Sequence, residues 1–296
     1  MSNIWIIITG VLVAICSGSL GCYLVLQKRA MLADAISHAV LPGIVIAYLL
    51  SGDRSPYLML IAASISGLVA TFLVDWLEKK VGLQADSSIG VTYTWMFAVG
   101  IILLAYFAGQ TDLDQECVLF GELIYVPLHK TEIFGFKIPI ATTRLSILML
   151  VIIGFLIACG RSLQLYSFDS AFAAFKGLST TLLHYTFLGL ISTTTVFSFE
   201  SVGVILVIAL LVIPPISAKL WASSVNKMIL ISAIYSIASV LIGFALAYYL
   251  DNTLSATITL SSAALFILSF IVKQILVRKK IEQNFSTASI SHEGRV

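Results

Sequence analysis

Apolar stretches about long enough to cross a lipid bilayer recur along the whole chain. The 296 residues include 17 Lys and Arg and 15 Asp and Glu, and 59% of all residues are hydrophobic. A soluble protein of this length could not cover its surface with so few charges. The four cysteines are too few for a secreted disulfide scaffold, and the apolar content excludes a disordered chain. The composition therefore predicts a polytopic membrane protein, and the net charge of +2 gives no reason to expect nucleic-acid binding.

The stretches predict an all-α fold with eight or nine transmembrane helices, since roughly 20 apolar residues cross the hydrocarbon core as a helix. The region Leu182–Trp221 holds only two charges, Glu200 and Lys219, and is too long for one span, so we expect it to break at Ser198–Ser201 into two. A short re-entrant or interfacial helix is expected at Val118–Tyr125. The other spans are Ile4–Leu26, Met31–Leu50, Tyr57–Leu77, Ile89–Ala108, Leu145–Gly160, Met228–Leu250 and Leu254–Leu276.

The distribution of basic residues predicts the orientation of these helices. Lys and Arg near the ends of spans gather on the cytoplasmic side of a membrane. This rule places the N-terminus outside and the C-terminus in the cytoplasm, with a transmembrane domain over residues 1–277 and a polar cytoplasmic tail over 278–296. Three basic residues fall on the outer side against the trend: Lys130, Lys137 and Arg144.

The strongest candidate for a functional site is the pair Asp34 and His38 inside the second span. Ionisable groups within membrane helices are costly and are therefore a functional hypothesis by default. A spacing of four residues places both side chains on one helical face, where a carboxylate and an imidazole can bind one divalent ion such as Mn, Fe or Zn. A buried ion pair that fixes helix packing and a proton relay are the alternatives. Two ligands are too few for a transition metal, so the site requires a dimer interface or other helices.

Four acidic residues are weaker metal candidates. Glu200 is expected at an outer helix end, where exposure to solvent is equally compatible with the sequence. Asp112, Asp114 and Glu122 belong to an acidic outer stretch that could attract cations, although an ordinary solvated loop has the same composition. His129, His184 and His292 have no partner at metal-ligand spacing and are expected at the membrane interface or in the tail.

A polar stretch between the fifth and sixth spans offers a surface for a partner. Phe168 and Asp169 open it, and Asp169 is placed to cap a short helix over Ser170–Phe175 that Gly177 would end. This segment is expected on the cytoplasmic side, and a plain connecting helix is the alternative. The chain contains no G-x-x-x-x-G-K-[ST], H-E-x-x-H, G-x-S-x-G or C-x-x-C motif, so we expect neither ATP binding in a P-loop nor covalent catalysis in this chain.

Four stretches together resemble the membrane subunit of bacterial ABC importers for manganese, zinc and iron. The similarity covers about residues 4–275, and its most specific part is the first stretch. The four are Gly21–Leu26 running into Met31–Gly43, Asp112–Asp114 into Val118–Glu122, Ser167–Asp169 into Gly177, and Val202–Val207 into Pro214. Two departures, Pro214–Ala218 and Lys176, affect packing and docking and leave the proposed ligands in place.

The resemblance implies a permease in a bacterial inner or plasma membrane. Its partners would be a second permease chain, identical or related, a cytoplasmic ATPase subunit and an extracytoplasmic metal-binding protein. Asp34 and His38 would lie on the metal path, and Tyr166–Thr181 would couple the chain to the ATPase. No permanently bound cofactor is implied, because the metal is the cargo, and the acidic outer stretch with Glu200 resembles the manganese and iron branch. The rival hypotheses are a proton-coupled secondary metal transporter that uses the same pair and a membrane scaffold that transports nothing.

Overall fold

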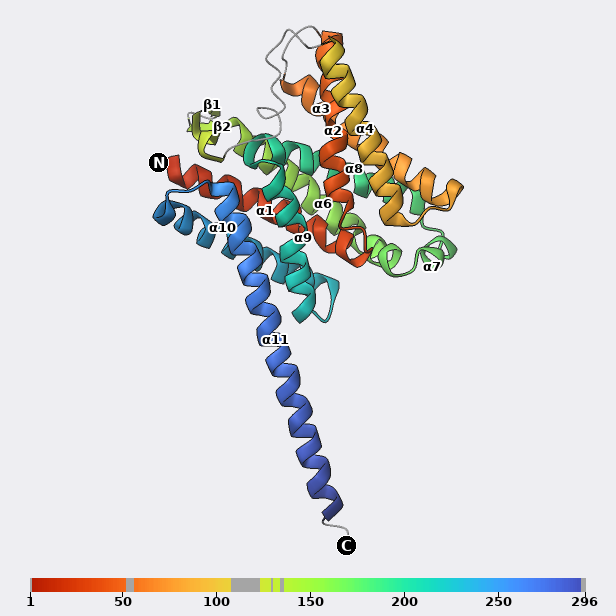
Figure 1. Ribbon diagram of the computed structural model, residues 1–296, viewed down its shortest axis with the longest axis vertical. Helices are drawn as coiled ribbons and strands as arrows, with labels where there is room; N and C mark the ends of the chain where they lie inside the picture. Colours follow the sequence, from red (N-terminus) through yellow and green to blue (C-terminus); the bar gives the residue numbers. More distant parts are fainter. Residues whose placement is uncertain (1, 52–55, 108–122, 129, 134–135, 294–296) are drawn as a thin grey trace.

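The computed structural model describes residues 2–51, 56–107, 123–128, 130–133 and 136–293, and it is built almost wholly from helices (Figure 1). Nine helices in these ranges are long and apolar enough to span a membrane, which confirms the predicted fold class. They are α1 (Ser2–Leu26), α2 (Leu32–Ser51), α3 (Pro56–Trp76), α4 (Ala85–Phe107), α6 (Ile140–Phe168), α8 (Thr180–Val202), α9 (Val204–Trp221), α10 (Val225–Leu250) and α11 (Leu254–Glu293). The shorter elements are the π-helix η1 (Leu77–Val81), the 3-10 helix η2 (Leu123–Leu128), the strands β1 (Lys130–Ile133) and β2 (Phe136–Pro139), and α7 (Ser170–Phe175).

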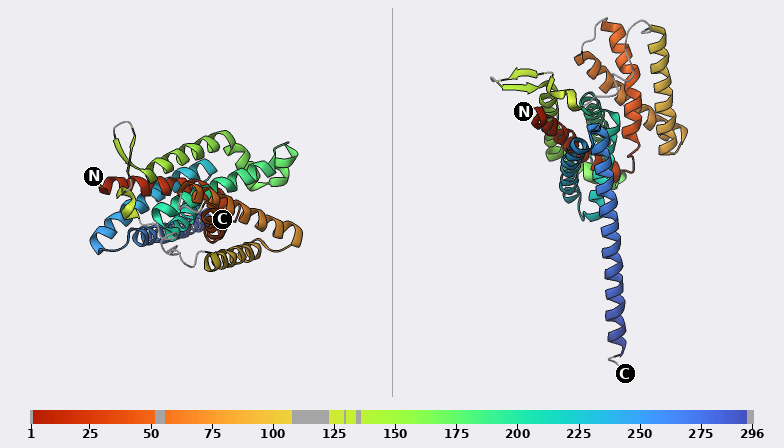
Figure 2. Two further views of the ribbon diagram at one scale, coloured as in Figure 1. Left: turned by 90° about the horizontal axis from the view of Figure 1, so that it is seen from above. Right: turned by 60° about the vertical axis from the view of Figure 1, so that its left-hand side comes forward.

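The long helices form two groups that meet at α8. Helices α2, α3 and α4 pack together on one side, and α1, α9, α10 and α11 pack together on the other (Figures 1 and 2). Hydroxyl side chains bridge neighbouring helices: Ser66 of α3 donates to the Ala39 carbonyl of α2 at 2.6 Å, and Ser192 of α8 donates to the Ser64 carbonyl of α3 at 2.9 Å. Small hydroxyl residues suit such contacts because they let helices approach closely and still satisfy a polar group. The α2–α4 group is therefore attached to the rest of the bundle through α3 and α8.

The region Leu182–Trp221 forms two spans, as predicted, but the division between α8 and α9 lies at Gly203, two residues after the predicted break at Ser198–Ser201. Gly203 has φ 82° and ψ 159°, a conformation that side chains with a Cβ rarely adopt. Ser198 and Ser201 are buried within the bundle. The polar residues that suggested a helix end face other helices instead, and the glycine supplies the change of direction.

A small β-hairpin, formed by β1 and β2, lies directly before α6 in the chain. The sequence did not predict it. Strands β1 and β2 pair antiparallel, with Lys130 opposite Pro139 and Ile133 opposite Phe136. The helix predicted at Val118–Tyr125 falls partly on residues 118–122, outside the described ranges, and its remainder lies in η2. We call this side of the bundle, where η2, β1 and β2 lie close to the start of α1, the hairpin end (Figure 1).

Two helices run further than the sequence predicted. Helix α6 covers Ile140–Phe168, where a span at Leu145–Gly160 was expected, and its last turns bring Tyr166 and Phe168 to the end of the bundle opposite the hairpin. Helix α11 continues to Glu293, beyond the predicted end of the ninth span at Leu276 (Figure 1). Residues 278–293 of the predicted polar tail therefore extend the last helix.

Candidate functional site

Asp34 and His38 project side by side from α2, one helical turn apart. The Nε2 atom of His38 lies 3.6 Å from Oδ1 of Asp34, and the two side chains are 39% and 37% exposed. Asp34 lies in the first turn of α2, where the helix dipole favours a negative charge. The separation exceeds a good hydrogen bond, so the pair is not closed on itself.

Aromatic side chains of α4 hold the imidazole in place. The His38 ring lies 5.5 Å from the Tyr93 ring and 5.3 Å from the Phe97 ring, measured between centroids. One turn further along α2, Pro42 has no N–H to donate to the His38 carbonyl. The ring is therefore fixed from one side, with Nε2 directed toward the carboxylate.

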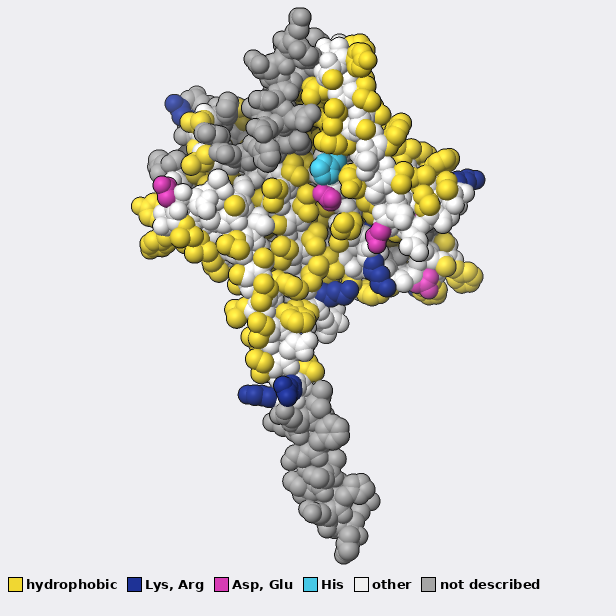
Figure 3. Space-filling model, in the orientation of Figure 1, with side chains coloured by type: hydrophobic (Ala, Val, Ile, Leu, Met, Phe, Trp, Pro, Cys, Tyr) yellow, Lys and Arg dark blue, Asp and Glu magenta, His cyan; other side chains and the backbone are white. Residues whose placement is uncertain are grey.

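The geometry of the pair suits a shared metal ion. Transition metals bind imidazole nitrogen and carboxylate oxygen at about 2.0–2.2 Å, so two ligands at a tetrahedral angle lie about 3.4 Å apart. The observed 3.6 Å is close to this spacing. In the described part of the chain, no three His, Cys, Asp or Glu side chains gather in one metal-binding group. Figure 3 shows an imidazole beside a carboxylate on a mostly apolar face. Among the residues that the structure describes, the pair is thus an open half-site with two of the ligands that a metal ion needs.

Of the weaker metal candidates, the one that the structure describes is not joined to this pair. Glu200, near the end of α8, binds Arg144 of α6, whose Nη1 donates to the two carboxylate oxygens at 3.1 and 2.8 Å. Asp112, Asp114 and Glu122 lie outside the described residues. Asp34 and His38 are therefore the two predicted ligands that the structure brings together.

The predicted short helix is present as α7, with the expected cap. The Asp169 carboxylate accepts a hydrogen bond from the Phe172 N–H at 2.9 Å, and Gly177 has φ 79°, the left-handed conformation that ends the segment. The phenylalanines of this segment remain at the surface: Phe168 is 67% exposed and Phe175 is 88% exposed. Such aromatic exposure at the end of the bundle opposite the hairpin is typical of a protein-binding surface.

A buried ionic network near α7 was missed by the sequence analysis. Asp75 of α3 is 2% exposed, and its carboxylate accepts hydrogen bonds from Nη1 of Arg29 at 2.9 Å and from Nε2 of His184 at 2.6 Å. His184 is 5% exposed and is paired inside the bundle, with a partner that its sequence spacing did not indicate. Burial alone would lower the pKa of Arg29, but the hydrogen bond that Arg29 donates to Asp75 and the charges of Glu78 and Asp75 outweigh it and raise that pKa. No local spacing indicates this network, because Asp75 and His184 stand 109 residues apart.

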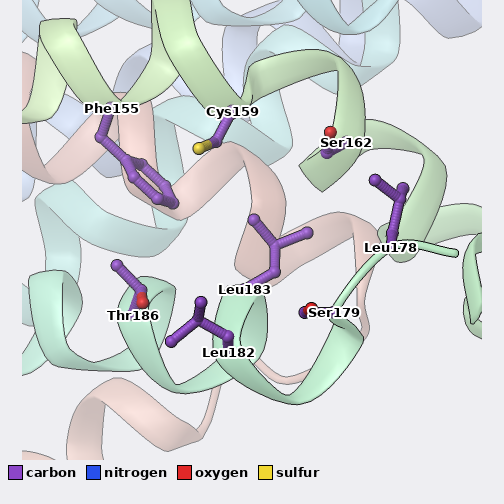
Figure 4. A pocket seen from close by; sticks show the side chains of 8 residues that line it. All are labelled: Phe155, Cys159, Ser162, Leu178, Ser179, Leu182, Leu183 and Thr186. Carbon is purple, nitrogen blue, oxygen red and sulfur yellow. The ribbon is translucent and has the colours of Figure 1, made fainter.

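The hollow between α6 and the start of α8 does not suit a metal ion. Its volume is about 280 Å³, and Figure 4 shows it lined by apolar side chains, one thiol and three hydroxyls. No carboxylate or imidazole borders it. Its lining residues are Phe155, Cys159, Ser162, Leu178, Ser179, Leu182, Leu183 and Thr186.

Residues 2–273 match the model of the ABC 3 transport family. The chain belongs to this family. It is 38% identical to the manganese transport system membrane protein MntD of Bacillus subtilis, over 90% of each chain, and 34% identical to a probable iron transport system membrane protein of Haemophilus influenzae, over 92% of this chain and 94% of that protein. The solved structure of PsaBC from Streptococcus pneumoniae in complex with Fab is similar at a TM-score of 0.76 and 27% identity, covering 93% of this chain and 94% of that one.

Membership of the ABC 3 transport family confirms the resemblance and the absence of an enzymatic role. The chain is a membrane-spanning subunit of an ABC transporter, and its nine candidate spans cover nearly the whole family match. No P-loop sequence occurs in these 296 residues.

Proposed function

We propose that the chain is the permease subunit of an ATP-driven importer of divalent transition-metal ions, with Mn²⁺ and Fe²⁺ favoured over Zn²⁺. The observation that carries the proposal is the Asp34–His38 pair, which presents one oxygen and one nitrogen ligand at the spacing of a shared ion. The names of relatives support the class of cargo, because they refer to manganese, iron and zinc transport.

The names of two relatives, which refer to manganese and iron, support the preference for these ions, whereas the ligand set itself accepts manganese, iron and zinc. An imidazole and a carboxylate, without thiolates, form a moderately hard ligand set. The described cysteines closest in sequence, Cys16 and Cys22, are buried in α1 and are not part of a metal-binding group with the pair. A site of this composition holds a softer ion no better than a harder one, so supply from outside decides which ion is transported.

A second permease chain would complete the site. The described part of one chain supplies two ligands on one face of α2, whereas a transition metal takes four or more. Two chains, identical or related, facing each other through α2 would supply four ligands around one ion. The mostly apolar surface beside the pair supports burial against another helix surface (Figure 3).

Two further partners fit the two ends of the bundle. The exposed phenylalanines of the α7 segment support docking of an ATPase subunit on that side, because this chain has no nucleotide site of its own. A binding protein would deliver the ion at the hairpin end. This assignment places the protein in a bacterial plasma membrane with its N-terminus outside and its C-terminus in the cytoplasm, as the basic residues predict.

Metal uptake by variants of the pair tests the proposal. The wild-type complex, reconstituted in vesicles with its ATPase and binding protein, should import Mn²⁺ only when ATP is supplied on the ATPase side. Asp34→Asn and His38→Ala should each abolish this import while the protein stays folded and membrane-inserted. The matched control is Asp86→Asn, the same change at an exposed residue in the first turn of α4. Normal import by both variants would overturn the assignment, and import driven by a proton gradient without ATP would favour the secondary-transporter alternative.

A further inference from the structure

Asp75 is the centre of a buried network that spans four parts of the chain. Besides its bonds to Arg29 and His184, its carboxylate lies 3.9 Å from Nζ of Lys79. Arg29 also binds the Glu78 carboxylate, and the Tyr166 hydroxyl lies 2.9 Å from Nδ1 of His184. We call Arg29, Asp75, Glu78, Tyr166 and His184 the Asp75 network.

One side of the network holds the start of the helix that carries the candidate metal ligands. Arg29 lies in the link between α1 and α2, and its carbonyl accepts a hydrogen bond from the Leu32 N–H at 3.0 Å, where α2 begins. Asp34 follows two residues later. Arg29 therefore makes two connections: its side chain binds Asp75, and its backbone carbonyl holds the first turn of α2.

The other side of the network holds the α7 segment. Tyr166 lies in the last turn of α6, three residues before the cap residue Asp169. A second link runs parallel to the network, since Nε2 of Gln27 donates to the Ser167 hydroxyl at 3.1 Å. Both connections join the α1–α2 link to the residues directly before α7.

The network is costly, which argues against a role as simple packing. Taking a carboxylate and a guanidinium out of water carries a large desolvation penalty, and apolar residues of similar volume often stabilise a protein equally well. Arg29 contacts two carboxylates through two different nitrogens, a geometry that a lysine could not reproduce. Ionic groups at this position therefore suggest that the connection itself is useful.

Space beside the network allows the α7 segment to move against it. A hollow of about 220 Å³ is bordered on one side by network residues and on the other by residues of α7 and the start of α8. Its lining comprises Lys79, Tyr166, Ser170, Ala171, Thr180, Thr181, His184 and Tyr185. Displacement of α7 can therefore change the Tyr166–His184 contact without a clash in a packed core.

We infer that the Asp75 network is a positioning device that transmits displacement of α7 to the first turn of α2, and so to Asp34 and His38. The inference rests on the proposed function, in which an ATPase subunit acts on α7 and the metal binds at α2. The inference assigns the members of the network no direct contact with the metal or with the ATPase subunit. They act through the helices that they join.

Amide hydrogen exchange on the full chain in lipid discs tests the connection without metal or ATPase. Tyr166→Phe removes one hydroxyl on the α7 side and should speed exchange in residues 32–37 about fivefold, the factor expected for one lost hydrogen bond. Arg29→Gln, on the α2 side, should speed exchange in residues 170–177 by a similar factor. Asp86→Asn should change neither region.

Two results would overturn the inference. One is that amide exchange becomes faster only near the substituted residue: around Tyr166 at the end of α6 in Tyr166→Phe, and around the α1–α2 link in Arg29→Gln. The other is an increase that includes the second half of α10, which packs from Val240 against Gly10 at the opposite end of α1. Such an increase would show that the network merely stabilises the whole fold. Neither result depends on whether Asp34 and His38 bind metal, so the inference can fail while the proposed function stands.

A second measurement separates transmission from binding in the complete complex. Asp75→Asn should keep Mn²⁺ affinity within about twofold and should still co-purify with the ATPase. ATP hydrolysis stimulated by the metal-loaded binding protein should nevertheless fall at least about tenfold. This loss is larger than the fivefold effect typical of one lost neutral hydrogen bond. Asp86→Asn should keep all three properties. Full stimulation in Asp75→Asn would overturn the inference. Loss of Mn²⁺ affinity in Asp75→Asn would overturn it too, because the network would then shape the metal site directly.

Discussion

Arg144 donates from one guanidinium nitrogen to both carboxylate oxygens of Glu200, at 3.1 and 2.8 Å, and this pair joins the start of α6 to the end of α8. The guanidinium carbon also lies 4.6 Å from the centre of the Tyr57 ring, at the start of α3. Three helices thus meet at one cation near the hairpin end. The negative charge of Glu200 is compensated within the chain, which removes the main reason to expect a metal there.

We predict that Glu200→Gln leaves metal binding intact. The glutamine retains a hydrogen-bond acceptor for Arg144 and loses only the charge, so the free energy of unfolding should fall by about 0.2–1 kcal/mol, as for other exposed ion pairs. Mn²⁺ titration and thermal unfolding in detergent are the measurements, with Asp34→Asn as the contrasting variant. A tenfold loss of Mn²⁺ affinity in Glu200→Gln would make it a ligand and contradict this account.

Local signals were sufficient to predict the α7 segment and most spans. Asp169 caps α7, and Gly177 adopts a positive φ, as the sequence suggested, because capping and left-handed turns depend on residues within a few positions of each other. The nine candidate spans follow from apolar length alone. Asp34 and His38 were likewise paired by their helical spacing.

Features that depend on distant partners were not predicted from the sequence. The charge of Glu200 suggested a break at Ser198–Ser201. Its ion-pair partner Arg144 stands 56 residues earlier, and the sequence does not show that the two residues meet. Asp75 was taken as part of an ordinary span, and His184 as interfacial, because the carboxylate and the imidazole meet only when α3 packs on α8. Periodicity reports which face of a helix is apolar, and it does not report which helix that face meets.

We predict that Gly203→Ala destabilises the protein through backbone strain. A residue with a Cβ at φ 82° and ψ 159° lies in a region that is essentially limited to glycine, so the free energy of unfolding should fall by about 1–3 kcal/mol. Thermal unfolding in detergent measures the effect. Gly154→Ala in α6 is the matched control, because a Cβ there meets nothing within 4 Å and alanine favours a helix. Equal unfolding temperatures of the two variants would show that the turn at Gly203 does not require glycine.

Labelling of single cysteines should report the orientation of the bundle. After replacement of the four native cysteines, cysteines at positions 53, 114 and 251 should react with an impermeant maleimide in intact cells. Cysteines at positions 79, 170 and 278 should react only after permeabilisation. The reason is that Lys and Arg near span ends remain in the cytoplasm. Reaction of positions 114 and 170 from the same side would disprove the alternation of the nine spans.

The α7 segment should be required for association with the ATPase subunit. Gly177 has φ 79°, and a Cβ there meets nothing within 4 Å, so any effect of substitution comes from the backbone and not from a clash. Gly177→Val should therefore displace the end of the segment, since a β-branched side chain is poorly tolerated at positive φ, whereas Gly177→Asn should be accepted. Asp169→Ala should weaken the start of α7 by about 0.5–2 kcal/mol, because the Phe172 N–H loses its acceptor.

Co-purification with the ATPase, together with ATP hydrolysis in the presence of metal-loaded binding protein, measures these effects. Gly177→Val and Asp169→Ala should keep Mn²⁺ binding at Asp34 and His38, because neither change removes a proposed metal ligand, but both should lose association or stimulated hydrolysis. Gly177→Asn is the matched control at the same position and should keep both. Phe175→Ala removes the most exposed aromatic side chain of α7 without changing the backbone, and it should weaken association alone. Full association and full hydrolysis in all of these variants would reduce the segment to a linker, and the link between α3 and α4, with Lys79 and Lys80, would become the better candidate for the contact.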